Sequence, residues 1–341
     1  MPSPGAGSEP LLEINDLHVS FRTEGGIVRA VDGLSLTVDV DDVVGVVGES
    51  GSGKTVSMMA VMRLIRDPNA IVSGQVLLRG RDLLALPSSE MRAVRGGEIA
   101  MIFQDPMTAL TPVYTVGWQI VEQLRAHRDL SRRAAKQRAV ELLAEVGIPN
   151  PERRVDQYPH EFSGGMRQRV MIAMALSCNP RLLIADEPTT ALDVTIQAQI
   201  LELMKRLRRD HGSSILIITH DMGVVSDLAE RVVVMYAGGV VEEGPKRAVF
   251  REPQHPYTWG LLDSIPRVGL TRGRRLTVIP GQPPSLLAPP AGCRFAPRCI
   301  YRFPKCDERP ALTAKVDADH ADACHLEPSA RRGLRDERRT A

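Results

Sequence analysis

The stretch "GESGSGKT", residues 48–55, has the residue types and spacing that most directly indicate chemistry. It fits the pattern G-x-x-x-x-G-K-S/T, whose glycines let successive backbone N–H groups converge on phosphate oxygens. The lysine of this pattern reaches the β- and γ-phosphates, and the hydroxyl that follows it can ligate Mg²⁺. The residues that we expect to bind a nucleoside triphosphate are Gly48, Ser50, Gly51, Ser52, Gly53, Lys54 and Thr55.

Two adjacent carboxylates, Asp186 and Glu187, end the apolar stretch "LLIADE". An unpaired charge at the end of a buried strand is costly, so both groups need a cation or a hydrogen-bond donor. We predict that Asp186 holds Mg²⁺ and that Glu187 orients or deprotonates an attacking water. The alternative is a pair of surface carboxylates without a catalytic role.

A histidine, His220, ends the next apolar stretch, "ILIITHD". If the two apolar stretches are parallel strands of one sheet, His220 and the carboxylates lie at the same sheet edge. This placement favours a contact between His220 and the γ-phosphate. A hydrogen-bonded structural histidine is the alternative.

The elements around these residues have the order of an α/β nucleotide-binding fold. "DDVVGVVG" reads as a buried strand and "KTVSMMAVMRLI" as a helix, so the glycine loop joins a strand to a helix. Residues 11–48 predict antiparallel strands and residues 115–175 predict helices. "RLLIADEP" and "SSILIITHD" predict buried parallel strands, and "RVVVMYAGGVVEEG" predicts a hairpin. These features predict a P-loop NTPase.

Composition and charge restrict the class of protein. The formal net charge is +2, from 43 basic and 41 acidic residues, which gives no electrostatic support for nucleic-acid binding. The N-terminal "MPSPGAGSEP" lacks the features of a signal peptide, and no apolar run approaches the ~20 residues of a membrane-spanning helix. We therefore expect a cytoplasmic chain, in which clustered cysteines indicate a metal site before a disulfide.

Four of the five cysteines lie in one Pro-rich segment, at Cys293, Cys299, Cys306 and Cys324. Their spacing matches neither the tight knuckles of zinc ribbons nor the ferredoxin patterns. Four thiolates suit zinc or an iron–sulfur cluster, and the spacing leaves both open. Four unrelated buried thiols are the alternative. We expect Cys178 to be a small buried hydrophobic residue.

Further motifs resemble those of the ATP-binding subunits of ABC transporters. "FSGGMRQRV" (162–170) resembles the signature motif, "MIFQDP" (101–106) the Q-loop, "TTALD" (189–193) the D-loop and "ITHD" the switch histidine. Phe21 lies where this family usually has an aromatic residue that stacks on adenine, although a core role is the alternative. The resemblance implies an ABC-type fold with a mixed sheet core, N-terminal antiparallel strands and a helical signature subdomain.

The resemblance also implies a mechanism. In this family two ATP-binding subunits face each other head to tail, and each signature motif contacts the ATP of the partner. Ser163, Gly164 and Gly165 would therefore bind the ATP of the partner subunit. Gln104 would join Thr55 and Asp186 around Mg²⁺. The catalytic residues would be Lys54, Gln104, Glu187 and His220.

The C-terminal segment resembles the extension of oligopeptide/dipeptide importers, through "HPYTWGLLDSIP", "IPGQPPSLLAPPAGCRFAPRC" and "ACHLEP". The boundaries that we expect are an ATPase domain at 11–250 with its helical subdomain at about 105–175, an extension at 251–328, and a disordered tail at 329–341. The resemblance implies peptide uptake at the cytoplasmic face of the cell membrane. Expected partners are a second, paralogous ATPase subunit, two permease subunits and an extracytoplasmic binding protein.

Other assignments stay open beside this one. The same branch includes importers of nickel, glutathione or other small solutes. A soluble ABC ATPase and an iron–sulfur sensor that only binds nucleotide are more distant alternatives. Some importers of this branch carry a 4Fe–4S cluster on their C-terminal cysteines, so the resemblance favours iron–sulfur over zinc for Cys293, Cys299, Cys306 and Cys324.

Overall fold

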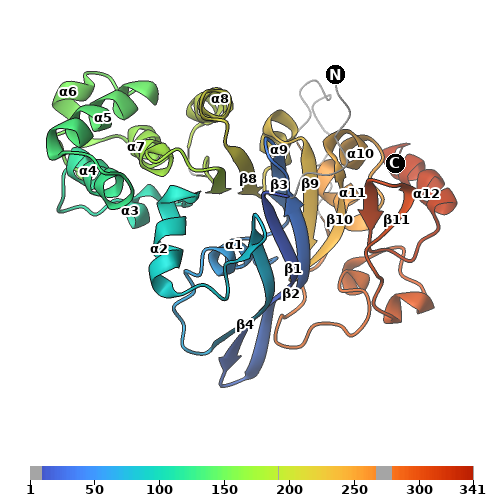
Figure 1. Cartoon of the computed structure of the whole chain (residues 1–341). Coiled ribbons are helices and arrows are strands. Elements are labelled where there is room, and N and C mark those ends of the chain that lie inside the picture. The colour runs from blue at the N-terminus through green and yellow to red at the C-terminus, as the bar shows by residue number, and fades with distance from the viewer. Residues whose placement is uncertain (1–9, 191, 266–278, 341) are drawn as a thin grey trace. The chain divides into compact units, whose positions relative to one another are not determined.

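The computed structural model describes residues 10–190, 192–265 and 279–340 (Figure 1). It divides the chain into two compact units. The signature unit includes Val38–Val43 and Ala85–Ile218, and the P-loop unit includes Leu12–Thr37, Val44–Leu84 and the described part of 219–341. The N-terminal nine residues and Ala191 of the predicted D-loop lie outside the described residues.

The P-loop unit begins with an antiparallel sheet, as the sequence predicts. Its strand order is β2-β1-β4-β5, with bounds β1 Leu12–Thr23, β2 Gly26–Val38, β4 Ala70–Leu78 and β5 Arg81–Asp82. β1 and β4 pair in antiparallel register, with Leu12 opposite Leu78 and Ile14 opposite Val76. These four side chains are buried and alternate with more exposed ones, so one face of the sheet contributes to the core.

The second group of strands in this unit surrounds β3 (Val43–Val47), which is buried throughout. β3 pairs in parallel with β9 (Arg231–Tyr236), and β9 forms the predicted hairpin with β10 (Gly239–Pro245). β12 (His320–Asp322) pairs antiparallel with β10, and β11 (Thr313–Asp317) pairs with β12. The C-terminal extension therefore continues the sheet of the ATPase fold by two strands.

The helices of the P-loop unit are α1 Lys54–Val61, α9 Met222–Leu228, α10 Lys246–Arg251, α11 Pro256–Asp263 and α12 Pro328–Thr340, with 3₁₀ turns η2 Ala296–Arg298 and η3 Pro304–Asp307. Helix α12 lies where the sequence predicts a disordered tail (Figure 1). The reason is a contact distant in sequence. Arg331 is buried, and its guanidinium donates to Asp322 at 2.8 Å and to Gln254 at 3.2 Å.

Three parallel strands form the sheet of the signature unit. β6 (Ile99–Ile102) pairs with β7 (Leu182–Asp186), and β7 pairs with β8 (Ser214–Thr219). All three are buried along their whole length. This confirms the parallel arrangement predicted for β7 and β8 from their continuous apolar runs, because strands covered on both faces need apolar residues at every position. β6 is a further parallel strand that the sequence pattern did not predict.

The helices of the signature unit are α2 Ser88–Gly97, α3 Pro106–Ala109, α4 Val116–His127, α5 Arg132–Glu145, α6 Pro151–Arg154, α7 Gly164–Leu176 and α8 Val194–His211, with the 3₁₀ turn η1 Pro159–Glu161. Side-chain oxygens cap five of them, at Asp105, Thr115, Ser131, Ser163 and Asp193. Helices α4, α5 and α7 form the helical region that the sequence predicts (Figure 1). Within the described chain, every helix is too short or too polar to cross a membrane.

Candidate nucleotide-binding and catalytic site

The glycine loop directly follows β3 in the P-loop unit. Gly48 has φ +157° and Gly53 has φ +99°, both in the region that favours glycine. Added Cβ atoms would lie 2.2 Å from the Met235 carbonyl oxygen at Gly48 and 2.4 Å from the Ala30 carbonyl oxygen at Gly53. Glycine is therefore required at both ends of the loop for its conformation and for its close packing.

Lys54 is the first residue of α1, and its side chain is buried within the loop. Its ammonium group donates to the carbonyl oxygens of Gly48 at 2.7 Å and Glu49 at 2.9 Å. Thr55 follows and is exposed. The Ser52 carbonyl oxygen accepts a hydrogen bond from the Gly238 N–H at 3.0 Å, which attaches the loop to the β9–β10 turn. The loop is thus held in a defined shape around its lysine.

Glu187 follows β7 in the signature unit, and two side chains contact its carboxylate. Gln104 Nε2 donates to Glu187 Oε2 at 3.2 Å, and Thr190 Oγ1 donates to the same oxygen at 2.8 Å. Glu187 has φ +46°, a strained conformation for this residue type, and its N–H donates to the Ile218 carbonyl oxygen at 2.8 Å. The strand end therefore fixes the position of the carboxylate that we predict as the base.

The parallel register explains why these groups meet. Gln104 follows the end of β6 and Glu187 the end of β7, and parallel neighbours bring their carboxyl ends to one edge. Asp186 is 2% exposed and pairs with Ile218 of β8, two residues before His220. The P-loop and His220 belong to one unit and the carboxylates to the other. Their combination into one Mg²⁺–nucleotide site stays a prediction.

The signature motif begins helix α7. Ser163 Oγ accepts a hydrogen bond from the Met166 N–H at 3.4 Å, and Ser163 and Gly164 are exposed. A Cβ atom at Gly164 would meet nothing within 4 Å, so this helix end is open to a ligand. Phe162, the first residue of the motif, is buried, and the Arg154 guanidinium lies over its ring, 5.6 Å from the ring centre. Phe162 therefore belongs to the core rather than to the exposed part of the motif.

Gln168 is a site residue that sequence reasoning missed. It lies on α7 and is buried, and its Nε2 donates to the Pro188 carbonyl oxygen at 2.6 Å. Pro188 directly follows Glu187. This bond connects the signature helix to the segment that follows β7. The available signal was a polar residue, Gln168, at an apolar-face position of "FSGGMRQRVMIAMAL".

A second missed cluster joins the extension to the antiparallel sheet of the P-loop unit. Asp32 of β2 is bound by Arg294 and by Arg309, the latter at 2.9 Å, and His18 Nδ1 lies 3.1 Å from the same carboxylate. Burial alone would raise the pKa of Asp32, but the two guanidinium groups outweigh it and hold the pKa below its usual value. Phe21 lies half-buried in β1 opposite Ala70, and its adenine contact stays a prediction.

The four clustered cysteines are free thiols in the extension. The Cys293 N–H donates to the Cys306 carbonyl oxygen at 2.9 Å, which joins two of them through the backbone. Burial raises the pKa of Cys299 to about 12 and that of Cys324 to about 11. Among the described residues, however, no group of three or more His, Cys, Asp or Glu side chains is arranged to hold a metal ion. The structure therefore does not support the predicted iron–sulfur cluster, because proximity in sequence has not produced a ligand geometry.

Comparison with known proteins places these features in a family. Residues 31–190 match the family described as ABC transporter, and residues 241–306 match the C-terminal region of oligopeptide/dipeptide transporters. The oligopeptide transport ATP-binding protein OppD of Bacillus subtilis is 54% identical over 323 residues, which cover 94% of this chain and 90% of that protein. This chain belongs to the ABC transporter ATP-binding family.

Other members of the family agree with this assignment. The dipeptide transport ATP-binding protein DppD of Bacillus subtilis is 51% identical over 321 residues, covering 94% of this chain and 95% of that protein. The dimeric, post-hydrolysis structure of the ATP-binding cassette MJ0796 bound to ADP and phosphate is 27% identical, with a TM-score of 0.62, over 69% of this chain and 99% of that one. The predicted ABC-type fold is therefore confirmed, and ATP hydrolysis is the activity expected of this ABC ATPase.

Proposed function

We propose that this ABC ATPase hydrolyses ATP to power the uptake of di- or oligopeptides through partner permease subunits. The observation that carries the proposal is the extent of the similarity. Peptide-transport ATP-binding proteins match more than nine-tenths of the chain, including the C-terminal region that distinguishes this branch. An ATPase domain of another branch would share the P-loop and signature motifs without that region.

The proposed hydrolysis gives each site residue the role that the resemblance implies. The P-loop and Lys54 would bind the phosphates, and Thr55, Gln104 and Asp186 would hold Mg²⁺. Glu187 takes a proton from the attacking water or orients it, and His220 contacts the γ-phosphate. The hydrogen bonds from Gln104 and Thr190 support this role of Glu187, because they orient its carboxylate.

A second ATPase subunit completes each site in this proposal. Ser163, Gly164 and Gly165 lie at the open N-terminal end of α7, where backbone N–H groups and the positive helix end favour a phosphate. They serve the ATP of the partner subunit. We propose a paralogous partner rather than a second copy of this chain, as the resemblance implies.

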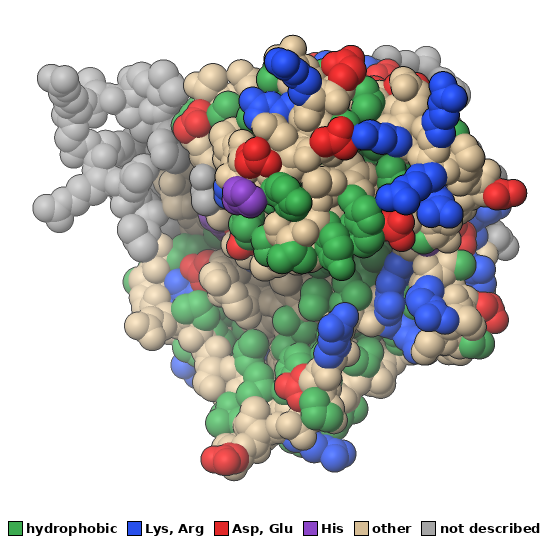
Figure 2. Space-filling view, turned by 90° about the vertical axis from the view of Figure 1, so that its left-hand side faces the viewer, with side chains coloured by type: hydrophobic (Ala, Val, Ile, Leu, Met, Phe, Trp, Pro, Cys, Tyr) green, Lys and Arg blue, Asp and Glu red, His purple; other side chains and the backbone are tan. Residues whose placement is uncertain are grey.

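An exposed aromatic patch on the signature unit supports a permease partner. Tyr114 and Trp118 stack with ring centres 3.9 Å apart, and Tyr158 lies exposed on the neighbouring segment. Backbone bonds from Val116 to Gln157 and from Gly117 to Val155, both 2.8 Å, hold the two segments side by side. Figure 2 shows hydrophobic side chains gathered on the face that lies on the left in Figure 1. Such a patch suits protein contact. We place the subunit peripherally, at the cytoplasmic face of the membrane.

The four-cysteine segment supports a further, separate proposal. We propose that Cys293, Cys299, Cys306 and Cys324 bind an iron–sulfur cluster, or zinc as the alternative, after a local rearrangement. All four thiols are free, and the Cys293 N–H donates to the Cys306 carbonyl oxygen at 2.9 Å, which brings two of the four residues together. The test is iron, acid-labile sulfide and zinc analysis of anaerobically purified protein. Zinc alone would exclude the cluster, and absence of all three would exclude the site.

The test of the transport function is reconstitution. The chain is purified with its partner ATPase and permease subunits in lipid vesicles, and ATP hydrolysis is measured with the binding protein and a panel of solutes. We expect stimulation by di- or oligopeptides and none by nickel or glutathione. Stimulation by nickel or glutathione alone would contradict the peptide proposal, and hydrolysis unaffected by permease subunits would indicate a soluble ATPase.

A further inference from the structure

The second residue of the glycine loop, Glu49, is paired with an arginine 249 residues later in the chain. Arg298 Nη1 donates to Glu49 Oε2 at 2.6 Å, and Nη2 donates to Oε1 at 3.0 Å. The side chain of Arg298 is 5% exposed and that of Glu49 is 27% exposed. This two-pronged, largely buried arrangement is the strongest form of ion pair between these residue types.

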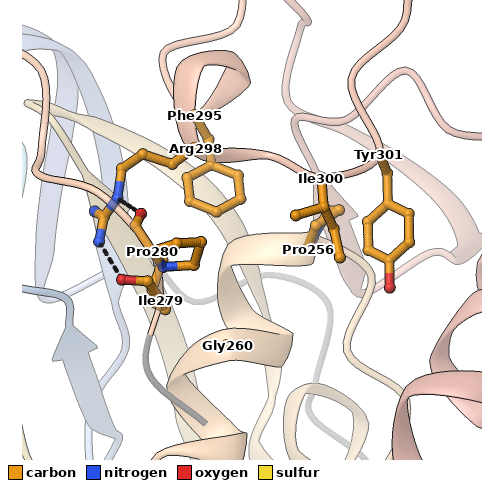
Figure 3. Close-up of a pocket in the computed structure, with 8 residues that line it drawn as sticks. All are labelled: Pro256, Gly260, Ile279, Pro280, Phe295, Arg298, Ile300 and Tyr301. Carbon is orange, nitrogen blue, oxygen red and sulfur yellow. Dashed lines mark hydrogen bonds between the residues drawn. The ribbon is translucent and has the colours of Figure 1, made fainter. Parts of the chain in front are cut away.

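The guanidinium of Arg298 is held in place by groups other than Glu49. Its Nε donates to the Pro280 carbonyl oxygen at 2.9 Å and its Nη2 to the Ile279 carbonyl oxygen at 3.2 Å, as Figure 3 shows. Nη1 also lies 3.3 Å from the Tyr236 hydroxyl. Because these contacts fix the planar group, Arg298 imposes a position on Glu49 rather than following it.

The backbone of Glu49 is held from two further directions. Its N–H donates to the Tyr257 hydroxyl at 2.8 Å, and its carbonyl oxygen accepts from the Lys54 ammonium at 2.9 Å. Tyr257 is buried against Tyr236 and Phe295, with ring centres 4.6 and 5.4 Å away. Tyr257, Phe295 and Arg298 all come from the C-terminal extension. The extension thus contacts both the backbone and the side chain of the phosphate loop.

A carboxylate in a loop that binds phosphate needs compensation. Left unpaired, Glu49 would repel the phosphate oxygens, and the repulsion would grow with the number of phosphates on the ligand. Pairing with Arg298 cancels this charge and holds the carboxylate in a half-buried position. The surface pair of Arg302 with Asp307, at 2.8 Å, has no such role, since both side chains are more than half exposed.

We propose that Arg298 is a positioning residue for the phosphate loop, acting through Glu49 to neutralise and orient the loop for ATP. The inference rests on the proposed ATPase function and adds a part of the machinery outside the nucleotide-binding motifs. It gives the C-terminal extension a defined task in the chemistry. In this role Arg298 acts on the loop through its pairing with Glu49.

The test measures binding of ATP, ADP and adenosine by the full-length chain. For R298A we expect the affinity for ATP to fall about tenfold, because the unpaired carboxylate of Glu49 repels the phosphate charges. The affinity for ADP should fall less, and the affinity for adenosine should not change. The double variant E49Q/R298A should recover most of the ATP affinity, since it removes the repelling charge. R298K keeps the charge without the fork, so we expect a loss of about threefold.

The control is R302A, an arginine of the same segment, which should bind all three ligands as the unmodified chain does. Thermal melting of each variant checks folding, and R298K provides the answer if R298A does not fold. Three outcomes would overturn this inference while leaving the proposed function intact. R298A could lose affinity for ATP and adenosine equally, R298K could bind ATP as tightly as the unmodified chain, or E49Q/R298A could fail to recover affinity for ATP. Failure of the unmodified chain to bind ATP would instead overturn the proposed function, and the inference with it.

Discussion

Gln104 and Glu187, 83 residues apart, meet at a hydrogen bond of 3.2 Å between the Gln104 Nε2 and the Glu187 Oε2. Each residue follows the carboxyl end of a strand, and the two strands are parallel neighbours. The bond places an amide donor on the carboxylate that we propose as the base. Substitution of either residue therefore perturbs the same carboxylate.

The first prediction concerns Glu187→Gln. An amide cannot accept the proton of the attacking water, so we expect ATP hydrolysis by the assembled transporter to fall by roughly 100-fold or more. ATP binding should persist, and the two ATPase subunits should accumulate in a closed, ATP-bound form. Hydrolysis is measured by phosphate release and closure by size-exclusion chromatography. Glu141→Gln, on the surface of α5, is the control. Unimpaired ATP hydrolysis in Glu187→Gln would contradict the proposed mechanism.

The second prediction concerns Gln168→Leu on the signature helix. The change removes the donor to the Pro188 carbonyl oxygen and leaves that buried acceptor without this bond. We expect a loss of about 1–3 kcal/mol in the free energy of unfolding, and slower hydrolysis because the segment after Glu187 loses its anchor. Urea unfolding and phosphate release measure the two effects. Gln137→Leu, at an exposed position of α5, is the matched control. Equal free energies of unfolding and equal hydrolysis rates for the two variants would contradict a role of the Gln168–Pro188 bond.

The third prediction concerns His255, which begins helix α11. Its Nδ1 accepts from the Tyr257 N–H at 3.1 Å, and its Nε2 is a buried atom without a hydrogen-bond partner among the described residues. Burial lowers the pKa of His255 to about 3, with Asp322 opposing this shift and Arg331 and Lys315 adding to it. The unfolded chain binds the proton near pH 6.5, so stability from this group is present above 6.5 and is lost as pH falls toward 3.

The measurement compares the unmodified chain with His255→Asn, whose side-chain oxygen can still cap the helix but does not titrate. Between pH 6.5 and 5 we expect the unmodified chain to lose up to ~2 kcal/mol more of its free energy of unfolding than the variant loses. Urea unfolding at each pH gives both values. Parallel pH dependence in the two proteins would show that His255 is not buried in its neutral form.

The fourth prediction concerns the reactivity of the cysteine cluster. Burial raises the pKa of Cys299 to about 12 and of Cys324 to about 11, so in metal-free protein both remain protonated thiols at pH 8. We expect slow alkylation by iodoacetamide that accelerates as pH rises above 9, because the thiolate is the reactive species. Stability contributed by these neutral thiols is lost over the same rise in pH.

Mass spectrometry follows alkylation of each cysteine over time, with urea-unfolded protein as the control for full exposure. A bound metal would give a different pattern, in which the thiols stay protected at every pH until a chelator is added. Rapid labelling of Cys299 at pH 7.5 in the folded, metal-free protein would show that burial does not hold it in the neutral form.

The sequence by itself determined the parts of the site that are contiguous in the chain. The glycine loop, the helix after it and the carboxylates at the end of β7 are encoded by local patterns, because backbone conformation and strand burial follow from neighbouring residues. Continuous apolar runs likewise predict β7 and β8 as parallel strands. The pairing of β6 with β7, which brings Gln104 and Glu187 to one edge, was seen only in the structure. The domain boundaries and the roles of the site residues stay predictions.

Only the tertiary structure decided which distant residues pair. Nothing in local periodicity connects Arg298 with Glu49, Gln168 with Pro188, or Arg331 with Asp322. The last of these pairs also explains why a charged segment predicted as a tail forms helix α12. A charged or amide side chain can form hydrogen bonds with many different groups. Which partner it takes depends on which groups folding buries beside it. The four cysteines show the converse: they lie close in sequence, yet among the residues that the structure describes they are not arranged to hold a metal ion.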